Sequence, residues 1–278
     1  MSATGRSKMV AGRQGKKKQK MTQILEYLRS NRVEPPIFDN DLVKRITGSE
    51  FGNQFDLTKF ASSAKLPTAL RENDCFPIHL GEGRHQIVWG ISNGYHIFEP
   101  ILGGAIRDWE YARSPLDGSD SSEAGALSLA FNQQILVHFL FGDRTIVPKI
   151  HLPRRTKHSF EYRMRDQLIS ATNLQIETDL TIEHRGTLAI FEAKNDDQDD
   201  MSDFAVYQLY HPYRYYVDRA HDGELQGIKV VRTVYVKKVV SAVRLYEYSF
   251  PKKQEPTSIE LFKAAEYRLT EASGLDRY

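Results

Sequence analysis

The sequence of 278 residues contains a single cysteine, Cys75. One cysteine excludes a disulfide within the chain and a finger-type zinc site, which needs at least two thiolates. No apolar run approaches the roughly 20 residues of a membrane-spanning helix, and no apolar stretch follows the N-terminal charges as in a secretory signal. These absences predict an intracellular, cytoplasmic protein without a membrane segment.

Acidic residues are missing from the first 20 residues, which carry seven cations. Because Gly, Ser and Lys dominate this segment, we expect residues 1–20 to form a disordered basic tail. The composition of the whole chain is typical of a globular protein, with 40% apolar and 27% charged residues. Since the total charge is only +2, the chain beyond the tail is acidic overall.

Residues 21–120 predict an α+β region. Apolar spacing indicates a helix over 21–31 and another over 39–47, the latter with Asn40 as N-cap and Gly48 beyond its end. Asn93-Gly94 predicts a β-hairpin, because Asn-Gly suits a two-residue turn. Gly81-Glu82-Gly83 lacks the following Gly and Lys of a phosphate-binding loop, so it indicates a simple turn.

Residues 121–278 alternate between helical and strand patterns. We expect one long helix over 123–141, capped by Ser122 and ended by Gly142, and a further helix over 160–168. Later segments follow in the order strand, strand, helix, strand, strand and a final helix or helix-strand: 175–183, 187–194, 204–219, 227–238, 242–249 and 259–270. This order predicts a mixed α/β layer fold.

The strand at 187–194 carries polar side chains on one face only. Period two places Glu192 and Lys194 beside the apolar residues of one face, while the other face stays apolar to the end of the strand. If the preceding hairpin turns at Arg185-Gly186, opposed residues have numbers that sum to 371. Asp179 and Glu192 then face each other, with Cβ atoms about 4.5–5.5 Å apart.

Two carboxylates this close repel each other unless they share a cation. Mg²⁺ prefers oxygen ligands and often binds through one or two carboxylates while keeping several waters. Asp179, Glu192 and the carbonyl of Ala193 are therefore candidate Mg²⁺ ligands, and Lys194 is a candidate to stabilise developing negative charge. The alternative is an exposed hairpin whose three charged side chains form a surface ion pair, because Glu-X-Lys triplets are frequent.

This pattern resembles the PD-(D/E)XK nuclease superfamily and, within it, type II restriction endonucleases. The match is Asp179, twelve further residues, and Glu192-Ala193-Lys194 at the end of an apolar strand. Thr178 stands where the family has Pro. Longer likeness extends over most of residues 35–270. The resemblance implies a mixed β-sheet flanked by helices, with an N-terminal α+β region before a nuclease core at 121–278.

The resemblance also implies further site residues. Glu161, expected on a helix before the first strand, matches an additional acidic residue of many members, and Gln208 matches a Gln on the helix that follows the Lys strand. An ordinary surface Glu and a core helix are the alternatives. Four cations upstream of the hairpin are candidate DNA contacts, with a solvated charged face as the alternative: Arg154, Arg155, Lys157 and Arg163.

The activity implied by the resemblance is Mg²⁺-dependent hydrolysis of phosphodiester bonds in double-stranded DNA at a short recognised sequence, by a homodimer. The N-terminal region is then a candidate DNA-contacting element. We expect deletion of residues 1–20 to lower non-specific affinity more than site-specific cleavage. Two alternatives stay open: a non-sequence-specific or modification-dependent repair nuclease of the same fold, and a catalytically inactive DNA-binding protein.

Overall fold

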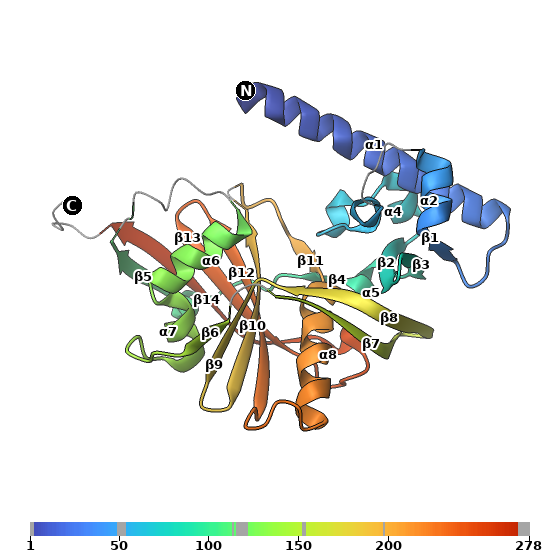
Figure 1. Cartoon of the computed structure of the whole chain (residues 1–278). Coiled ribbons are helices and arrows are strands. Elements are labelled where there is room, and N and C mark those ends of the chain that lie inside the picture. Colours follow the sequence, from blue (N-terminus) through green and yellow to red (C-terminus); the bar gives the residue numbers. More distant parts are fainter. Residues whose placement is uncertain are drawn as a thin grey trace.

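A seven-stranded mixed sheet lies at the centre of the computed structural model (Figure 1). The structure describes residues 3–48, 54–112, 114, 122–151, 154–196 and 198–271, without the side chains of 3–14, 55 and 271. The strand order is β5 (Ile106–Tyr111), β14 (Glu260–Glu271), β13 (Ala242–Ser249), β12 (Val230–Val239), β10 (Thr187–Asn195), β9 (Leu180–His184) and β6 (Lys149–His151). The pairs β10–β12 and β14–β5 are parallel and the others are antiparallel.

The hairpin of β9 and β10 has the register that the sequence predicts. Thr187 pairs with His184 and Phe191 with Leu180, so each pair of numbers sums to 371. Arg185 and Gly186 form the turn with φ angles of 46° and 83°, as a type I′ turn requires. The last pair of the ladder contains Leu180, the residue that directly follows Asp179 in the chain. Asp179 therefore lies just beyond the paired strand.

Strand β10 separates two hydrophobic cores. Leu188 and Ile190 belong to one core, whereas Ala189, Phe191 and Ala193 belong to the other. This division confirms the period-two assignment, because successive side chains of a strand point to opposite faces. Glu192 and Lys194 lie on the face that carries Leu188 and Ile190.

Helices cover both faces of the sheet (Figure 1). Helices α6 (Glu123–Asn132) and α7 (Ile135–Phe141) pack with the core that contains Phe191. Helix α8 (Tyr207–His221) packs on the opposite face and connects β10 to its parallel neighbour β12, a connection that a parallel pair requires.

The single long helix predicted over 123–141 is wrong, because the chain bends by 69° between α6 and α7. Gln134 lies at the break in the left-handed region, with a φ of 59°. The predicted ends are confirmed: Ser122 accepts a hydrogen bond from the Gly125 amide at 3.1 Å, and Gly142 ends α7 with a φ of 73°. Within the described ranges, no single helix is long and apolar enough to cross a membrane, although this bent pair meets the test of length and composition.

The helix predicted over 160–168 is also wrong. Residues 154–178 form a long antiparallel hairpin of β7 (Arg154–Met164) and β8 (Gln167–Thr178). Phe160, Tyr162 and Met164 are buried, while Glu161 and Arg163 between them are exposed. This alternation has the period of a strand and fits no helix face. The final segment likewise forms a strand, β14, rather than a helix.

The N-terminal region packs around a second sheet, of order β1–β3–β2. Its elements, with the strands and 3-10 helices that adjoin it, are α1 (Ala3–Ser30), β1 (Ile37–Asp39), α2 (Asn40–Thr47), α3 (Phe55–Thr58), η1 (Ser63–Lys65), α4 (Thr68–Glu72), β2 (Cys75–Gly81), β3 (Arg84–Trp89), α5 (Ile91–Gly94), β4 (Tyr95–Ile97), η2 (Gly103–Ala105), β11 (Asp203–Ala205) and η3 (Pro256–Ser258). Strand β4 pairs with β11, and β5 joins the central sheet. Strands from region 21–120 thus pair with strands from region 121–278.

Three local predictions in this region need correction. Residues 3–20 belong to helix α1 instead of a disordered tail. Asp39, not Asn40, caps α2, because its carboxylate accepts from the Leu42 amide at 2.8 Å. Asn93-Gly94 ends the short helix α5 instead of a hairpin, since β3 pairs with β2 across the Gly81-Glu82-Gly83 turn. That turn is confirmed.

A close backbone approach joins the N-terminal sheet to β8. A Cβ atom added at Gly81, whose φ is 85°, lies 2.0 Å from the Thr172 carbonyl oxygen and 2.8 Å from the Leu174 nitrogen. These neighbours are backbone atoms, which cannot move aside as the end of a flexible side chain can. Only glycine therefore allows β2 to contact β8 at this point.

We expect Gly81→Ala to lower the free energy of unfolding by about 3 kcal/mol or more, the sum of left-handed strain and overpacking. Gly223→Ala is a matched control, because Gly223 has a φ of 78° but nothing within 4 Å of the added Cβ. The control should lose only about 1 kcal/mol. Equal losses in urea denaturation of the two variants would contradict the close approach.

Candidate functional site

Four of the predicted site residues meet where β9 begins and β10 ends. Asp179 lies in the bend between β8 and β9, Glu192 and Lys194 lie on β10, and Gln208 lies in the first turn of α8. The carboxylate of Asp179 reaches across to β10, where its Oδ2 accepts a hydrogen bond from the Ala193 amide at 3.0 Å. This hydrogen bond holds the carboxylate of Asp179 against the strand that carries Glu192, although Asp179 itself is not paired in the sheet.

The ammonium group of Lys194 is surrounded by three oxygens. Its Nζ lies 2.7 Å from Glu192 Oε1, 3.0 Å from the Ala193 carbonyl and 2.5 Å from Glu123 Oε1. Lys194 and Glu192 are largely buried, with side-chain exposures of 16% and 13%. Burial strengthens such charge pairs, but it also penalises any charge that loses its partner.

Glu123 is a site residue that the sequence reasoning missed. It is the first residue of α6, next to the N-cap Ser122, and a helix N-terminus favours an acidic side chain. The sequence signal for Glu123 was its position in the first turn of a helix that Ser122 caps. The signal did not reveal that α6 brings Glu123 to Lys194, which is 71 positions away in the sequence.

Gln208 holds the second carboxylate in place. Its Nε2 donates to Glu192 Oε1 at 2.6 Å, so this oxygen accepts from both Gln208 and Lys194. The Oε1 atom of Gln208 is buried and has no hydrogen-bond partner among the described residues. A buried acceptor without a partner is unfavourable, so this atom marks a position where a bound group could donate.

Burial raises the pKa of Glu192 from 4.5 to about 7, and nearby Asp179 and Glu123 add to this effect while Lys194 opposes it. Burial also raises the pKa of Asp179, against the hydrogen bond from Ala193 and the charge of Lys194. Burial alone would lower the pKa of Lys194, but Glu192 and Glu123 outweigh it and raise that pKa. The site thus holds more negative charge than Lys194 can offset.

The structure separates Glu161 from the four site residues described above and does not place it in the lining of the cavity beside them. Glu161 lies on the exposed face of β7, where its Oε1 accepts from the Ser170 hydroxyl at 2.7 Å. The helix that was expected to carry it is a strand whose alternate residues face solvent. Glu123 of α6 is the additional acid that the fold brings to the site.

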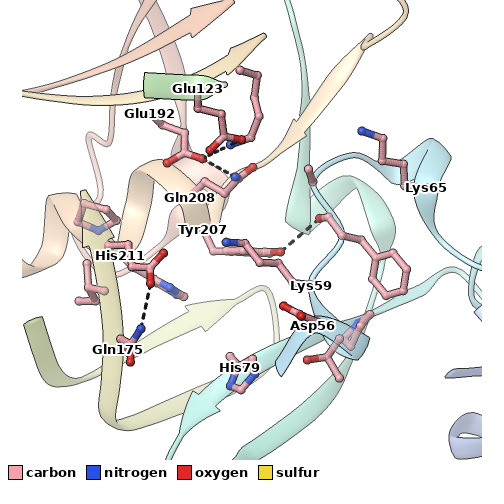
Figure 2. Close-up of a pocket in the computed structure, with 18 of the residues that line it drawn as sticks. Asp56, Lys59, Lys65, His79, Glu123, Gln175, Glu192, Tyr207, Gln208 and His211 are labelled. Carbon is pink, nitrogen blue, oxygen red and sulfur yellow. Dashed lines mark hydrogen bonds and ion pairs between the residues drawn. The ribbon is translucent and has the colours of Figure 1, made fainter. Parts of the chain in front are cut away.

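A cavity of about 600 Å³ opens beside these residues (Figure 2). We call it the central cavity. Asp179, Glu192, Lys194, Gln208 and Glu123 line it from the sheet, α8 and α6. The N-terminal region supplies cations that the sequence reasoning did not assign to the site: Lys17, Lys18, Lys59 and Lys65. The Nζ atom of Lys17 donates to the Lys59 carbonyl and lies 4.2 Å from the centre of the Phe60 ring.

None of the four predicted DNA-contacting cations, all of which the structure describes, lines the central cavity. Arg155 forms an ion pair of 2.9 Å with Glu177, and Lys157 opposes Gln175 on β8. Because Glu177 and Gln175 do line the cavity, these two cations lie one strand away from it. Arg154 and Arg163 lie on the same exposed hairpin.

The donor set is compatible with a hard divalent cation. Among the side chains that the structure describes, no three His, Cys, Asp or Glu groups are arranged to hold a metal ion together. Mg²⁺ can nevertheless bind through one or two carboxylates and waters. The carboxylate of Glu192 and the carbonyl of Ala193 already converge on one positive charge, the Lys194 ammonium. Two of the three groups predicted as Mg²⁺ ligands, Glu192 and the Ala193 carbonyl, thus already share one cation.

The family described as "Domain of unknown function (DUF6997)" matches residues 90–268. The chain belongs to this family. No curated protein and no solved structure matches the chain. The matched residues include Glu123, Asp179, Glu192, Lys194 and Gln208, whereas the lysines of the N-terminal wall lie outside the match.

The raised pKa of Glu192 predicts a pH dependence of stability. Glu192 ionises near 4.5 in the unfolded chain and near 7 in the folded chain, so the free energy of unfolding should fall as pH rises between these values. The expected fall is about 3 kcal/mol. It should be measured by urea denaturation in EDTA at pH 5 and pH 8.

Glu192→Gln removes this titration and should flatten the pH dependence, whereas Glu161→Gln on the exposed face of β7 should retain it. A wild-type slope in Glu192→Gln would contradict the burial of this carboxylate as the cause.

Proposed function

We propose that this chain is a Mg²⁺-dependent nuclease of the PD-(D/E)XK type that hydrolyses phosphodiester bonds of double-stranded DNA at a specific sequence, as type II restriction endonucleases do. The observation that supports this most is the convergence of Asp179, Glu192 and Lys194 at two neighbouring strand ends beside a lysine-lined cavity. A mixed sheet flanked by helices, as described above, is compatible with this fold.

Each site residue has a role in the proposed reaction. Asp179, Glu192 and the Ala193 carbonyl would hold Mg²⁺, which supplies Lewis-acid stabilisation and a more acidic water. Lys194 stabilises negative charge that develops on the phosphoryl oxygens. Gln208 orients Glu192 through their 2.6 Å hydrogen bond. Glu123 holds the Lys194 ammonium toward the carboxylates.

The charge of the cavity supports a polyanionic substrate. Lysines of α1, of the segment before Phe60 and of η1 line the central cavity together with the carboxylates. This local basic wall fits the requirement that a chain of nearly neutral total charge binds DNA through a cleft. We further propose a homodimer, because a symmetric DNA site suits a symmetric protein, and action on intracellular DNA.

A non-sequence-specific or modification-dependent repair nuclease is the second candidate, because it needs the same three catalytic residues. Discrete fragments from a long DNA support restriction, a smear supports a non-specific nuclease, and a difference between methylated and unmethylated DNA supports modification dependence. Binding without any cleavage in Mg²⁺ supports the third candidate, an inactive DNA-binding protein.

Purified protein should cut plasmid DNA in Mg²⁺ into discrete fragments. Asp179→Ala, Glu192→Ala and Lys194→Ala should each lower the rate by roughly 10²- to 10⁴-fold, because each removes a group that touches the metal or the transition state. Glu161→Ala is the matched acidic control and should cut at the wild-type rate. Undiminished cleavage by Asp179→Ala or Glu192→Ala would overturn the site assignment.

The position of Lys17 and Lys18 changes the expectation for the N-terminal segment. Because both line the central cavity, Lys17→Gln/Lys18→Gln should lower site-specific cleavage as well as DNA affinity. The salt dependence of binding, log Kd against log salt concentration, should lose about 2 in slope. Lys44→Gln/Arg45→Gln, on the exposed face of α2, removes the same charge away from the cavity and should leave cleavage unchanged. Equal effects of both double variants would contradict a role of the cavity lysines.

A further inference from the structure

The central cavity extends well beyond the residues needed for hydrolysis. Along β8 its lining runs from Asp179 back to Leu174, a distance of about 16 Å at about 3.3 Å per residue. Figure 2 shows Glu123 and Glu192 at one end, His79 and Gln175 at the other, and Tyr207 and Lys59 between them. A volume of about 600 Å³ is within the range of small-molecule and cofactor sites.

The two ends of the cavity differ in chemistry. The end near the sheet carries the site carboxylates and Lys194, while Lys59 lies along the middle. The far end is lined by apolar groups, among them Pro77, Leu174 and Ile176, together with the carboxylates of Asp56 and Glu177. Burial lowers the pKa of His79 to about 2 and that of His211 to about 3, so both imidazoles are neutral near pH 7. The far end therefore suits a flat group without negative charge that donates hydrogen bonds to carboxylates.

Flat side chains form part of the wall between the two ends. Tyr207 stacks with His211 at a centroid distance of 5.7 Å and an interplanar angle of 28°, and its hydroxyl donates to the Phe60 carbonyl at 3.3 Å. Aromatic walls of this kind bind nucleobases by stacking with little sequence preference. The unsatisfied Gln208 Oε1 is a further acceptor in the lining.

We propose that the central cavity binds one nucleotide of the substrate strand with its base unstacked, next to the phosphodiester that is hydrolysed. This inference rests on the proposed function, because it assigns the anionic part of the ligand to the scissile strand. A nucleotide has the same asymmetry as the cavity: its phosphate matches the metal end and Lys59, and the amino groups of its base match the acceptors of the far end. A base within a duplex exposes only its groove edges, so it enters an enclosed pocket only after it leaves the stack.

The central cavity can be filled without replacing a catalytic group. Ala64 lies on η1, is exposed, and lines the cavity, so Ala64→Trp should fill the cavity while the fold is retained. Ala220→Trp, near the end of α8 and outside the cavity lining, is the control for a large aromatic substitution.

The first measurement is binding of the four deoxynucleoside 5′-monophosphates in Ca²⁺ by calorimetry, which needs no cleavage. Wild type and Ala220→Trp should bind, and Ala64→Trp should bind at least tenfold more weakly. The second uses duplexes with 2-aminopurine beside the cut position, whose fluorescence rises when the base unstacks. Wild type should raise the fluorescence at one position, a mispaired base there should bind at least tenfold more tightly, and Ala64→Trp should abolish both effects.

The outcomes separate this inference from the proposed function. Plasmid cleavage that depends on Asp179, without nucleotide binding or any rise in fluorescence, overturns the base pocket and leaves the nuclease intact. Nucleotide binding that Ala64→Trp weakens, in a protein that cuts no DNA, supports the pocket and overturns the nuclease. Equal nucleotide binding by wild type and Ala64→Trp also overturns the pocket.

Discussion

The arrangement of the site depends on the buried ammonium group of Lys194. Its surroundings join three parts of the chain, because Glu192 and the Ala193 carbonyl come from its own strand, Glu123 comes from α6, and Gln208 of α8 donates to the same Glu192 oxygen. Removing a partner from such a buried set leaves an uncompensated charge, which is strongly unfavourable. The sheet, α6 and α8 must therefore keep their relative positions for the site to exist.

The two hydrophobic cores hold these elements in their relative positions. Strand β10 is buried on both faces, with α6 and α7 on one side and α8 with the N-terminal region on the other. Its charged residues, Glu192 and Lys194, lie near the end of one face, where both line the cavity. Because the backbone of β10 is paired with β12 along its whole length and with β9 as far as Phe191, Glu192 and Lys194 project from a rigid element, as precise positioning requires.

The N-terminal region has a larger part in the site than a separate domain would have. Helix α1, the segment before Phe60 and η1 form one wall of the central cavity, and β2 contacts β8 through Gly81. The site carboxylates come from one part of the chain and most of the cavity lysines from another. Opposite charges thus line the same space of nucleotide size, which links the fold to the proposed chemistry.

The sequence alone determined the features that depend on local backbone geometry. The alternation of residues in β10 and the turn at Arg185-Gly186 fixed which residues of the hairpin meet, and so placed Asp179 near Glu192. Only the tertiary structure decided which distant groups complete the site. Phe160, Tyr162 and Met164 carried a strand pattern, yet the pairing of β7 with β8 was needed to place Glu161 on an exposed face. Glu123 and the N-terminal lysines reach the site through packing between elements far apart in the chain, and no local pattern of residues encodes that packing.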